Sequence, residues 1–143
     1  MSVSLLVITH NQIGAELLTT ATRMFGRCPL AASAINVTEY DDPDQLQALA
    51  TRLANELDDG SGLLILTDLF GSTPSNVANS IRQGHQVRVL TGVNLPMLVR
   101  ALNYHSLDLG GITEKALSGG REGVLLCQLN EPQSQPAEIR PLI

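Results

Sequence analysis

Short apolar segments alternate with helical patterns along most of the 143 residues, and this alternation limits the possible folds more than any other feature. The clearest apolar segments are residues 3–8 and 62–67, which consist mainly of valine, isoleucine and leucine. Apolar runs of about 4–8 residues are typical of strands that are covered on both faces. Strands that alternate with helices predict parallel βαβ units joined by right-handed crossovers. The sequence therefore predicts an α/β fold with one doubly wound sheet and helices on both of its faces.

The pattern predicts five strands separated by helices. The predicted strands cover residues 3–8, 32–37, 62–67, 85–91 and 122–127. The predicted helices cover about residues 11–26, 43–57, 74–84, 97–102 and 112–117. Asp42 and Thr73 are the expected N-caps of the second and third helices, because each is followed by a proline suited to the first helical position.

The last residues of the chain form no regular pattern. Residues 130–143 contain three prolines and no hydrophobic period. Proline lacks a backbone N–H, so such a segment cannot be a central strand or a regular helix. We expect one domain over residues 1–129, followed by an extended or partly disordered tail.

The composition excludes several classes of function. The net charge is −5 and no basic patch is present, so neither nucleic acid nor an anionic membrane surface is an expected partner. The N-terminal apolar run is too short to cross a membrane and no basic region precedes it, which predicts a cytoplasmic protein. Cys28 and Cys127 lack the spacing of a zinc site or a disulfide framework, so buried or half-buried thiols are expected. No metal and no cofactor is predicted.

Two of the predicted strands end on a titratable side chain, with His10 after the first and Asp68 after the third. If these strands are neighbours, as in the flavodoxin-like strand order, the chain reverses direction between them, and ligands bind at such a point. His10 and Asp68 are then expected to face each other. A carboxylate that accepts a hydrogen bond from Nδ1–H leaves the Nε2 lone pair free as a nucleophile and stabilises the cation formed on attack.

The turn after Asp68 is expected to bind an anion. Gly71 allows the backbone to approach a ligand closely, and Ser72 and Thr73 follow it at the start of a predicted helix. Backbone N–H groups, hydroxyls and the positive end of the helix dipole favour an anion there, and phosphate is the best candidate. The sequence has no Walker loop and no second acidic residue beside Asp68 to hold magnesium, which argues against an ATP-dependent kinase. Together with His10, the turn indicates phosphoryl transfer through a phosphohistidine.

Four segments carry a resemblance to a known family. They are Ile-Thr-His at residues 8–10, Thr-Asp-Leu-Phe-Gly-Ser-Thr-Pro-Ser-Asn at 67–76, Thr-Gly-Val-Asn-Leu-Pro-Met-Leu at 91–98 and Gly-Arg-Glu-Gly at 120–123. In this order they resemble the mannose-class (mannose/fructose/sorbose) IIA component of the bacterial phosphoenolpyruvate-dependent sugar phosphotransferase system. The resemblance extends over nearly all of the domain predicted at residues 1–129, which is thereby identified as a IIA domain.

The resemblance implies that His10 accepts a phosphoryl group at Nε2 from phospho-HPr and passes it to a IIB component, which phosphorylates a sugar during uptake. It also implies that Asp68 is the partner of His10 and that Gly71, Ser72 and Thr73 line the active site. Members of the family are typically homodimers, and their last strand lies antiparallel in the sheet and is in some cases exchanged between subunits. Residues 122–127 would be that strand. The sequence shows no IIB domain, so the acceptor is expected to be a separate protein or to be absent.

Two other functions remain open. In the first, the phosphorylation state of His10 controls binding to a partner protein and no sugar is phosphorylated. The second is a related carrier that feeds a dihydroxyacetone kinase, but the turn at residues 68–74 is more similar to the sugar-transport branch. Phe70 and Met97 could contact a docking protein or pack in the core. His85 and His105 have no evident partners in the sequence and are expected to be structural.

Overall fold

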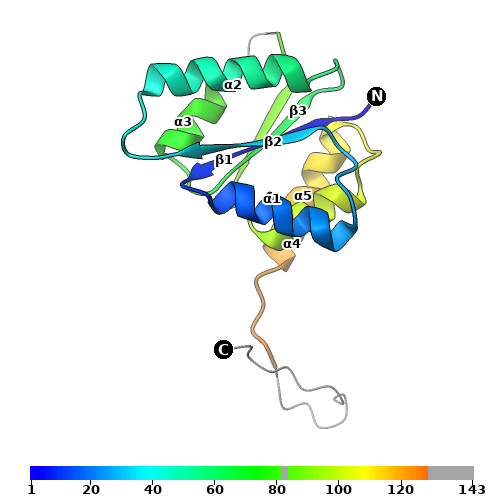
Figure 1. The fold of residues 1–143 in the computed structure, drawn as a ribbon. Helices are drawn as coiled ribbons and strands as arrows, with labels where there is room; N and C mark the ends of the chain where they lie inside the picture. The colour runs from blue at the N-terminus through cyan, green and yellow to red at the C-terminus, as the bar shows by residue number, and fades with distance from the viewer. Residues whose placement is uncertain (82–83, 129–143) are drawn as a thin grey trace.

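Four parallel strands form the centre of the computed structural model, which describes residues 1–81 and 84–128 (Figure 1). The strands are β1 (Ser4–His10), β2 (Ala32–Val37), β3 (Leu63–Thr67) and β4 (Val87–Thr91). The helices of the described part of the chain are α1 (Ile13–Phe25), α2 (Pro43–Leu57), α3 (Thr73–Asn79), α4 (Leu95–Asn103) and α5 (Leu109–Glu122). The strands lie in the order β2-β1-β3-β4. This is the flavodoxin-like order, with β1 and β3 as neighbours.

Helices cover both faces of the sheet, with α2 and α3 on one side and α1, α4 and α5 on the other (Figure 1). Along β1, Leu5 and Val7 belong to the core shared with α1, α4 and α5, whereas Leu6 and Ile8 belong to the core beneath α2 and α3. All four side chains are fully buried. Successive residues of a strand point to opposite faces, so a strand with a core on each side is apolar throughout. The predicted doubly wound α/β arrangement is confirmed.

Helix α5 is longer than the short helix predicted at residues 112–117. Four of its 14 residues are glycine, which lowers helix propensity and masks the helix in the sequence. A Cβ atom at Gly119 would lie only 2.6 Å from Cβ of Arg100, and one at Gly120 would lie 2.7 Å from Cε of Met97. The glycines therefore allow α4 and α5 to pack closely, and this packing compensates for the low propensity.

The prediction of a fifth strand at residues 122–127 is wrong, because the sheet of the described residues has four strands. Glu122 is the last residue of α5, and residues 124–128 leave the body as an extended segment, shown in orange in Figure 1. Val124, Leu125 and Leu126 are 79–84% exposed. The apolar pattern of a strand is present, but a strand also requires a neighbour that pairs with its backbone. The described chain supplies no such neighbour to this segment.

Helix α3 begins and ends differently from the prediction. Its N-cap is Ser72 and not Thr73. The helix ends at Asn79 rather than near residue 84, and the hydroxyl of Ser80 donates a hydrogen bond to the Val77 carbonyl at 2.6 Å. Serine side chains compete with helical backbone bonds in this way, which accounts for the early end.

The prediction for the two cysteines is also wrong, because both lie in segments outside the two hydrophobic cores. Cys28 and Cys127 are exposed and not buried or half-buried as predicted. Cys28 lies in the turn between α1 and β2, and Cys127 lies in the extended segment after α5. The predicted tail at residues 130–143 lies outside the described residues.

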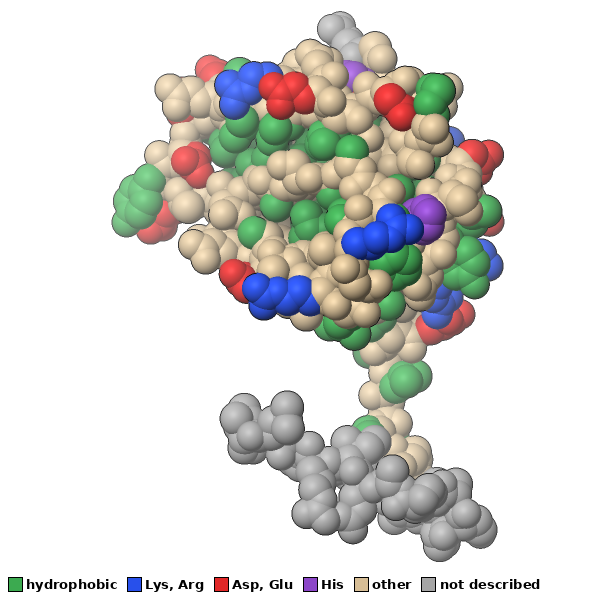
Figure 2. All heavy atoms as spheres, turned by 45° about the vertical axis from the view of Figure 1, so that its right-hand side comes forward, with side chains coloured by type: hydrophobic (Ala, Val, Ile, Leu, Met, Phe, Trp, Pro, Cys, Tyr) green, Lys and Arg blue, Asp and Glu red, His purple; other side chains and the backbone are tan. Residues whose placement is uncertain are grey.

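Charged and apolar side chains are mixed over the surface. On the face that Figure 2 shows, lysine and arginine side chains stand apart from one another among aspartate and glutamate side chains. Binding to nucleic acid requires a continuous basic patch, and these side chains form none in this view. No helix in the described part of the chain is both long enough and apolar enough to cross a membrane.

Candidate functional site

His10 and Asp68 lie side by side at the carboxyl edge of the sheet. His10 is the last residue of β1, and Asp68 follows the last residue of β3. These strands are parallel neighbours with Ile8 opposite Thr67, so both strands end at the same edge. Since β2 lies on the other side of β1, the chain reverses its direction across the sheet at this point.

One oxygen of Asp68 holds His10 through two hydrogen bonds. Nδ1 of the imidazole lies 2.9 Å from Oδ2 of Asp68, and the backbone N–H of His10 donates to the same oxygen at 3.0 Å. The side chain of His10 is 42% exposed and that of Asp68 is 15% exposed. In the neutral imidazole, this contact assigns the proton to Nδ1 and leaves the lone pair on Nε2. None of the described residues forms a hydrogen bond with Nε2.

The carboxyl group of Asp68 is held in its ionised form. Burial by itself raises its pKa, but hydrogen bonds from the side chain and backbone of His10 outweigh this effect, so the pKa lies below its ordinary value of 3.8. The second oxygen, Oδ1, is buried and has no hydrogen-bond partner among the described residues. Near neutral pH the ring of His10 therefore faces the negatively charged carboxylate of Asp68.

The turn after His10 is fixed to its surroundings by hydrogen bonds. Asn11 has a positive φ of 48°, which asparagine tolerates better than most residues, and its N–H donates to the Val37 carbonyl at 2.8 Å. The buried hydroxyl of Thr9 accepts a hydrogen bond from the N–H of Gly14 at 2.7 Å. These bonds fix α1 against the strand that carries His10. Sequence reasoning missed Thr9, for which the signal was a polar side chain at the end of an apolar run.

The turn after Asp68 leads directly into α3. Gly71 has a φ of 80°, a conformation that glycine adopts without strain. The hydroxyl of Ser72 donates to the Leu69 carbonyl at 2.6 Å and makes no capping hydrogen bond to α3. Ser72 is half-buried and Thr73 is exposed. The three residues predicted to bind phosphate thus lie together at the start of α3. Because the Ser72 side chain makes no capping hydrogen bond, it does not occupy the first backbone N–H groups of this helix.

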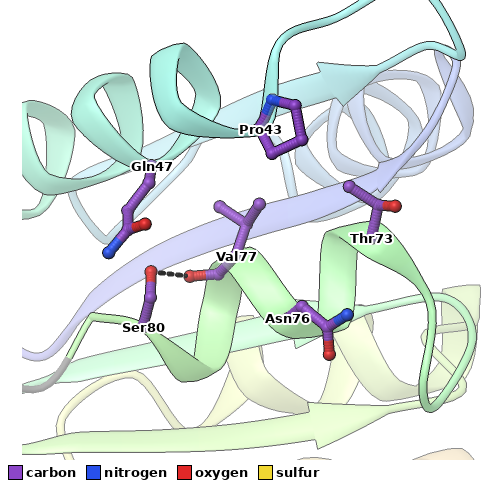
Figure 3. Close-up of a pocket in the computed structure, with 6 residues that line it drawn as sticks. All are labelled: Pro43, Gln47, Thr73, Asn76, Val77 and Ser80. Carbon is purple, nitrogen blue, oxygen red and sulfur yellow. Dashed lines mark hydrogen bonds between the residues drawn. The ribbon is translucent and has the colours of Figure 1, made fainter.

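An open groove of about 200 Å³ lies between α2 and α3 and has Thr73 at one end (Figure 3). The residues that line it are uncharged: Pro43, Gln47, Thr73, Asn76, Val77 and Ser80. Figure 3 shows Thr73 at the beginning of α3 and Ser80 beyond its last turn. The groove contains no carboxylate, imidazole or thiol, so it lacks groups for acid–base chemistry. Over the described residues, no cluster of three or more side chains could hold a metal ion.

His85 forms a second histidine–aspartate pair at the opposite edge of the sheet, just before β4. Its Nδ1 lies 2.7 Å from Oδ2 of Asp58, and its Nε2 lies 2.8 Å from Oδ1 of Asn55. The expectation that His85 has no partner is therefore wrong. Because both ring nitrogens are engaged, neither offers a free lone pair to a substrate. His105 packs edge-on against the ring of Phe25, with the ring centroids 6.2 Å apart.

The family model described as the PTS system fructose IIA component, where PTS denotes the phosphotransferase system, matches residues 4–117. The chain belongs to this PTS IIA family. The match runs from β1 into α5 and includes both His10 and Asp68. The IIA chain is also 30% identical over 127 residues to the PTS system mannose-specific EIIAB component of Escherichia coli (strain K12). The aligned region covers 87% of this chain and 39% of that protein. The chain therefore spans about two fifths of the length of that relative.

Solved structures agree with the assignment to the IIA family. The mannose/sorbose specific IIA subunit of the phosphotransferase system from Enterococcus faecalis has a TM-score of 0.82 and 26% identity, over 92% of this chain and 98% of that chain. A sigma-54 interaction domain protein from Enterococcus faecalis has a TM-score of 0.73 and 16% identity, over 85% of this chain and 93% of that chain. The second likeness shows the fold alone. Membership of the mannose-class IIA family, which the sequence motifs indicated, is confirmed.

Proposed function

We propose that this IIA chain is a cytoplasmic phosphocarrier that accepts a phosphoryl group from phospho-HPr on Nε2 of His10 and passes it to a IIB component for sugar uptake. The observation that supports this proposal best is the 2.9 Å contact between Nδ1 of His10 and Oδ2 of Asp68. The 42% exposure of the His10 side chain also supports it, because the ring must meet two partner proteins. Membership of the IIA family supports a role in the sugar phosphotransferase system.

In the proposed reaction, the Nε2 lone pair of His10 attacks phosphorus while the bond between phosphorus and the donor breaks. A bond forms between Nε2 and phosphorus, and the ring becomes positively charged because Nδ1 keeps its proton. Asp68 stabilises this charge, since its ionised carboxylate accepts the hydrogen bond from Nδ1. Transfer to the acceptor reverses these steps, without a metal or a cofactor.

Gly71, Ser72 and Thr73 are proposed to contact the phosphoryl group during transfer. In support, these residues lie at the start of α3, and the Ser72 side chain makes no capping hydrogen bond to the helix. Backbone N–H groups and hydroxyls at the start of a helix stabilise negative charge on the oxygens of a transferring phosphoryl group. Their role is thus electrostatic, whereas His10 supplies the nucleophile.

The test is phosphorylation of the purified chain by Enzyme I, HPr and labelled phosphoenolpyruvate. The wild type should acquire acid-labile label, and His10→Ala should acquire none. His85→Ala is the matched control, because His85 is also paired with an aspartate, and it should be labelled like the wild type. Label that persists in His10→Ala would assign the phosphohistidine to another residue. An unlabelled wild type beside an active HPr control would refute the proposal.

Addition of IIB proteins separates a carrier from a regulator. A carrier should lose its label to a IIB protein, whereas a regulator should keep it and bind a partner protein in only one phosphorylation state. The likeness to the sigma-54 interaction domain protein is at 16% identity, so it concerns the fold alone and does not distinguish the two functions, whereas the relatives named above belong to the sugar phosphotransferase system. The carrier is therefore the main proposal, and retention of label with every IIB protein tested would favour the regulator.

We further propose that the chain forms a homodimer in which residues 124–127 pair with the sheet of the other subunit. The exposure of Val124, Leu125 and Leu126 supports this, because pairing would remove apolar surface from water. β4 is an edge strand of the described sheet and has unpaired backbone groups to offer. Sedimentation should give a dimer mass for the wild type and a lower mass for Leu125→Asp. A wild type with the mass of a monomer would contradict the homodimer.

A further inference from the structure

Two strongly exposed aromatic side chains lie in the loops that follow β2 and β3, the strands on either side of β1, whose last residue is His10. Tyr40 is 89% exposed and Phe70 is 79% exposed. The sequence contains two tyrosines, two phenylalanines and no tryptophan. Two of these four aromatic side chains, Tyr40 and Phe70, are thus strongly exposed at one edge of the sheet. Tyr40 lies three residues beyond Val37, which is the β2 partner of His10, and Phe70 lies two residues beyond Asp68. Exposed aromatic residues beside a reactive group are typical of a surface that binds another protein.

The loop that carries Tyr40 is held in one conformation. The backbone N–H and the hydroxyl of Thr38 donate to Oδ2 of Asp41 at 2.7 and 3.1 Å. The N–H of Asp41 donates to the Thr38 carbonyl at 3.3 Å, and the N–H of Tyr40 donates to the Thr38 hydroxyl at 3.3 Å. Asp42 then caps α2. Because the loop is already ordered, little conformational entropy is lost when Tyr40 is bound.

The same loop concentrates negative charge at the carboxyl edge of the sheet, the edge at which His10 lies. Its exposed carboxylates belong to Glu39, Asp41, Asp42 and Asp44. No lysine or arginine occurs in residues 28–51. Complementary charge accelerates association and excludes partners of the wrong sign. A protein that binds here must therefore present lysine and arginine side chains around an apolar centre.

We infer that Tyr40, Phe70 and the acidic loop of residues 38–44 form the docking surface for a basic phosphoryl-donor protein. The inference rests on the proposed function. The strand that carries His10 lies between the two strands whose following loops carry Tyr40 and Phe70. The aromatic side chains contact the apolar centre of the donor, and the loop carboxylates contact its surrounding cations. Docking here determines the KM for the donor, whereas His10 and Asp68 determine the rate of transfer in the complex.

A second copy of the chain is the main alternative occupant of this surface. The extended segment that is suited to dimer formation follows α5, and α5 packs against β3 and β4. The acidic loop follows β2, at the other side of the sheet. A dimer formed through the β4 edge would thus leave the docking surface open to the donor.

The test measures initial rates of His10 phosphorylation as a function of phospho-HPr concentration. Tyr40→Ala should raise the KM for phospho-HPr about tenfold and leave kcat unchanged, since truncation of an interface anchor weakens binding by about this factor. Tyr104→Ala is the matched control, because Tyr104 is the other tyrosine, follows α4 and is 39% exposed. It should leave both constants unchanged.

The charge of the loop is tested separately. Glu39→Lys should raise the KM several-fold at low ionic strength, and the effect should diminish in high salt. Glu56→Lys is its control, because it makes the same change in net charge near the far end of α2. An equal effect of Glu56→Lys would show that net charge attracts the donor and would overturn the assignment of the loop.

The outcomes distinguish this inference from the proposed function. A wild type that is labelled normally, with unchanged KM in Tyr40→Ala and Glu39→Lys, would overturn the docking surface and leave the phosphocarrier intact. A wild type that takes no label would overturn both. A change of sedimentation mass in Tyr40→Ala would assign Tyr40 to a contact between copies of the chain and would also overturn the inference.

Discussion

Replacement of Asp68 by asparagine separates the charge of this residue from its position. The amide is nearly the same size, and its oxygen can still accept the hydrogen bonds that His10 makes at 2.9 and 3.0 Å. A hydrogen bond to a charged group contributes about 1.5–3 kcal/mol, whereas one between neutral groups contributes about 0.5–1.5 kcal/mol. The difference is about 1–1.5 kcal/mol. Because the side chain of His10 is 42% exposed, water screens any further attraction between the charges.

We expect Asp68→Asn to lower kcat for phosphorylation about tenfold, since about 1.4 kcal/mol corresponds to a factor of ten in rate. The assay is the initial rate of labelling at saturating phospho-HPr, with circular dichroism to compare the folded state of variant and wild type. Asp58→Asn is the matched control, because it removes the carboxylate of the other histidine–aspartate pair. It should be labelled at the wild-type rate. A folded Asp68→Asn variant with unchanged kcat would refute the role of the charge in stabilising the cationic ring.

Three further predictions concern stability. His85→Ala should lower the free energy of unfolding by about 1–3 kcal/mol, because the buried carboxylate of Asp58 loses its imidazole partner; urea unfolding that matched the wild type would disprove this. Burial raises the pKa of Asp58, but hydrogen bonds from His85 and from backbone N–H groups outweigh this effect and hold the pKa below 3.8. The ionised carboxylate therefore contributes to the free energy of unfolding above pH 3.8, and this contribution is lost as the pH falls through the pKa of the folded state. The difference in unfolding free energy between the wild type and Asp58→Asn should therefore shrink below about pH 4, and a difference that stayed constant would contradict the assignment. Gly119→Ala should destabilise by about 1–3 kcal/mol, because its Cβ would lie 2.6 Å from Cβ of Arg100, whereas Gly110→Ala meets nothing closer than 3.9 Å and should be neutral or stabilising; equal thermal shifts would argue against close packing of α4 and α5.

Local patterns were sufficient where one short segment determines its own structure. The observed β2 has the predicted bounds of residues 32–37, and the start of α2 is defined by Asp42 and Pro43 as expected. The length of α5 depends on contacts with α4 across Gly119, which propensity does not describe. The strand expected at residues 122–127 had the right composition, but pairing depends on a neighbour and not on the segment itself.

The site was partly accessible to the same reasoning. His10 and Asp68 could be singled out because each follows an apolar strand, and their proximity follows from the order of the strands. The bond from the backbone N–H of His10 to Asp68 could not be predicted, since it depends on the local course of both strand ends. Hydrophobic character alone could not decide whether Phe70 and Met97 contact a docking protein or pack in the core. In the structure Phe70 is 79% exposed and Met97 is 3% exposed, because only Met97 lies on the buried side of a helix.

The two hydrogen bonds from His10 to a single oxygen of Asp68 have a consequence for the proposed transfer between two partner proteins. The ring is tied to the backbone of its own strand through that oxygen, so Nε2 keeps one direction of approach. In the proposed reaction, donor and acceptor must then reach Nε2 by the same route and occupy the same footprint in turn. A substitution that slows the dissociation of one partner would delay the binding of the other. The overall rate of transfer is therefore greatest when both complexes dissociate rapidly. The proposed donor and acceptor must also present similar shape and charge to this one footprint, which limits how far their surfaces can differ.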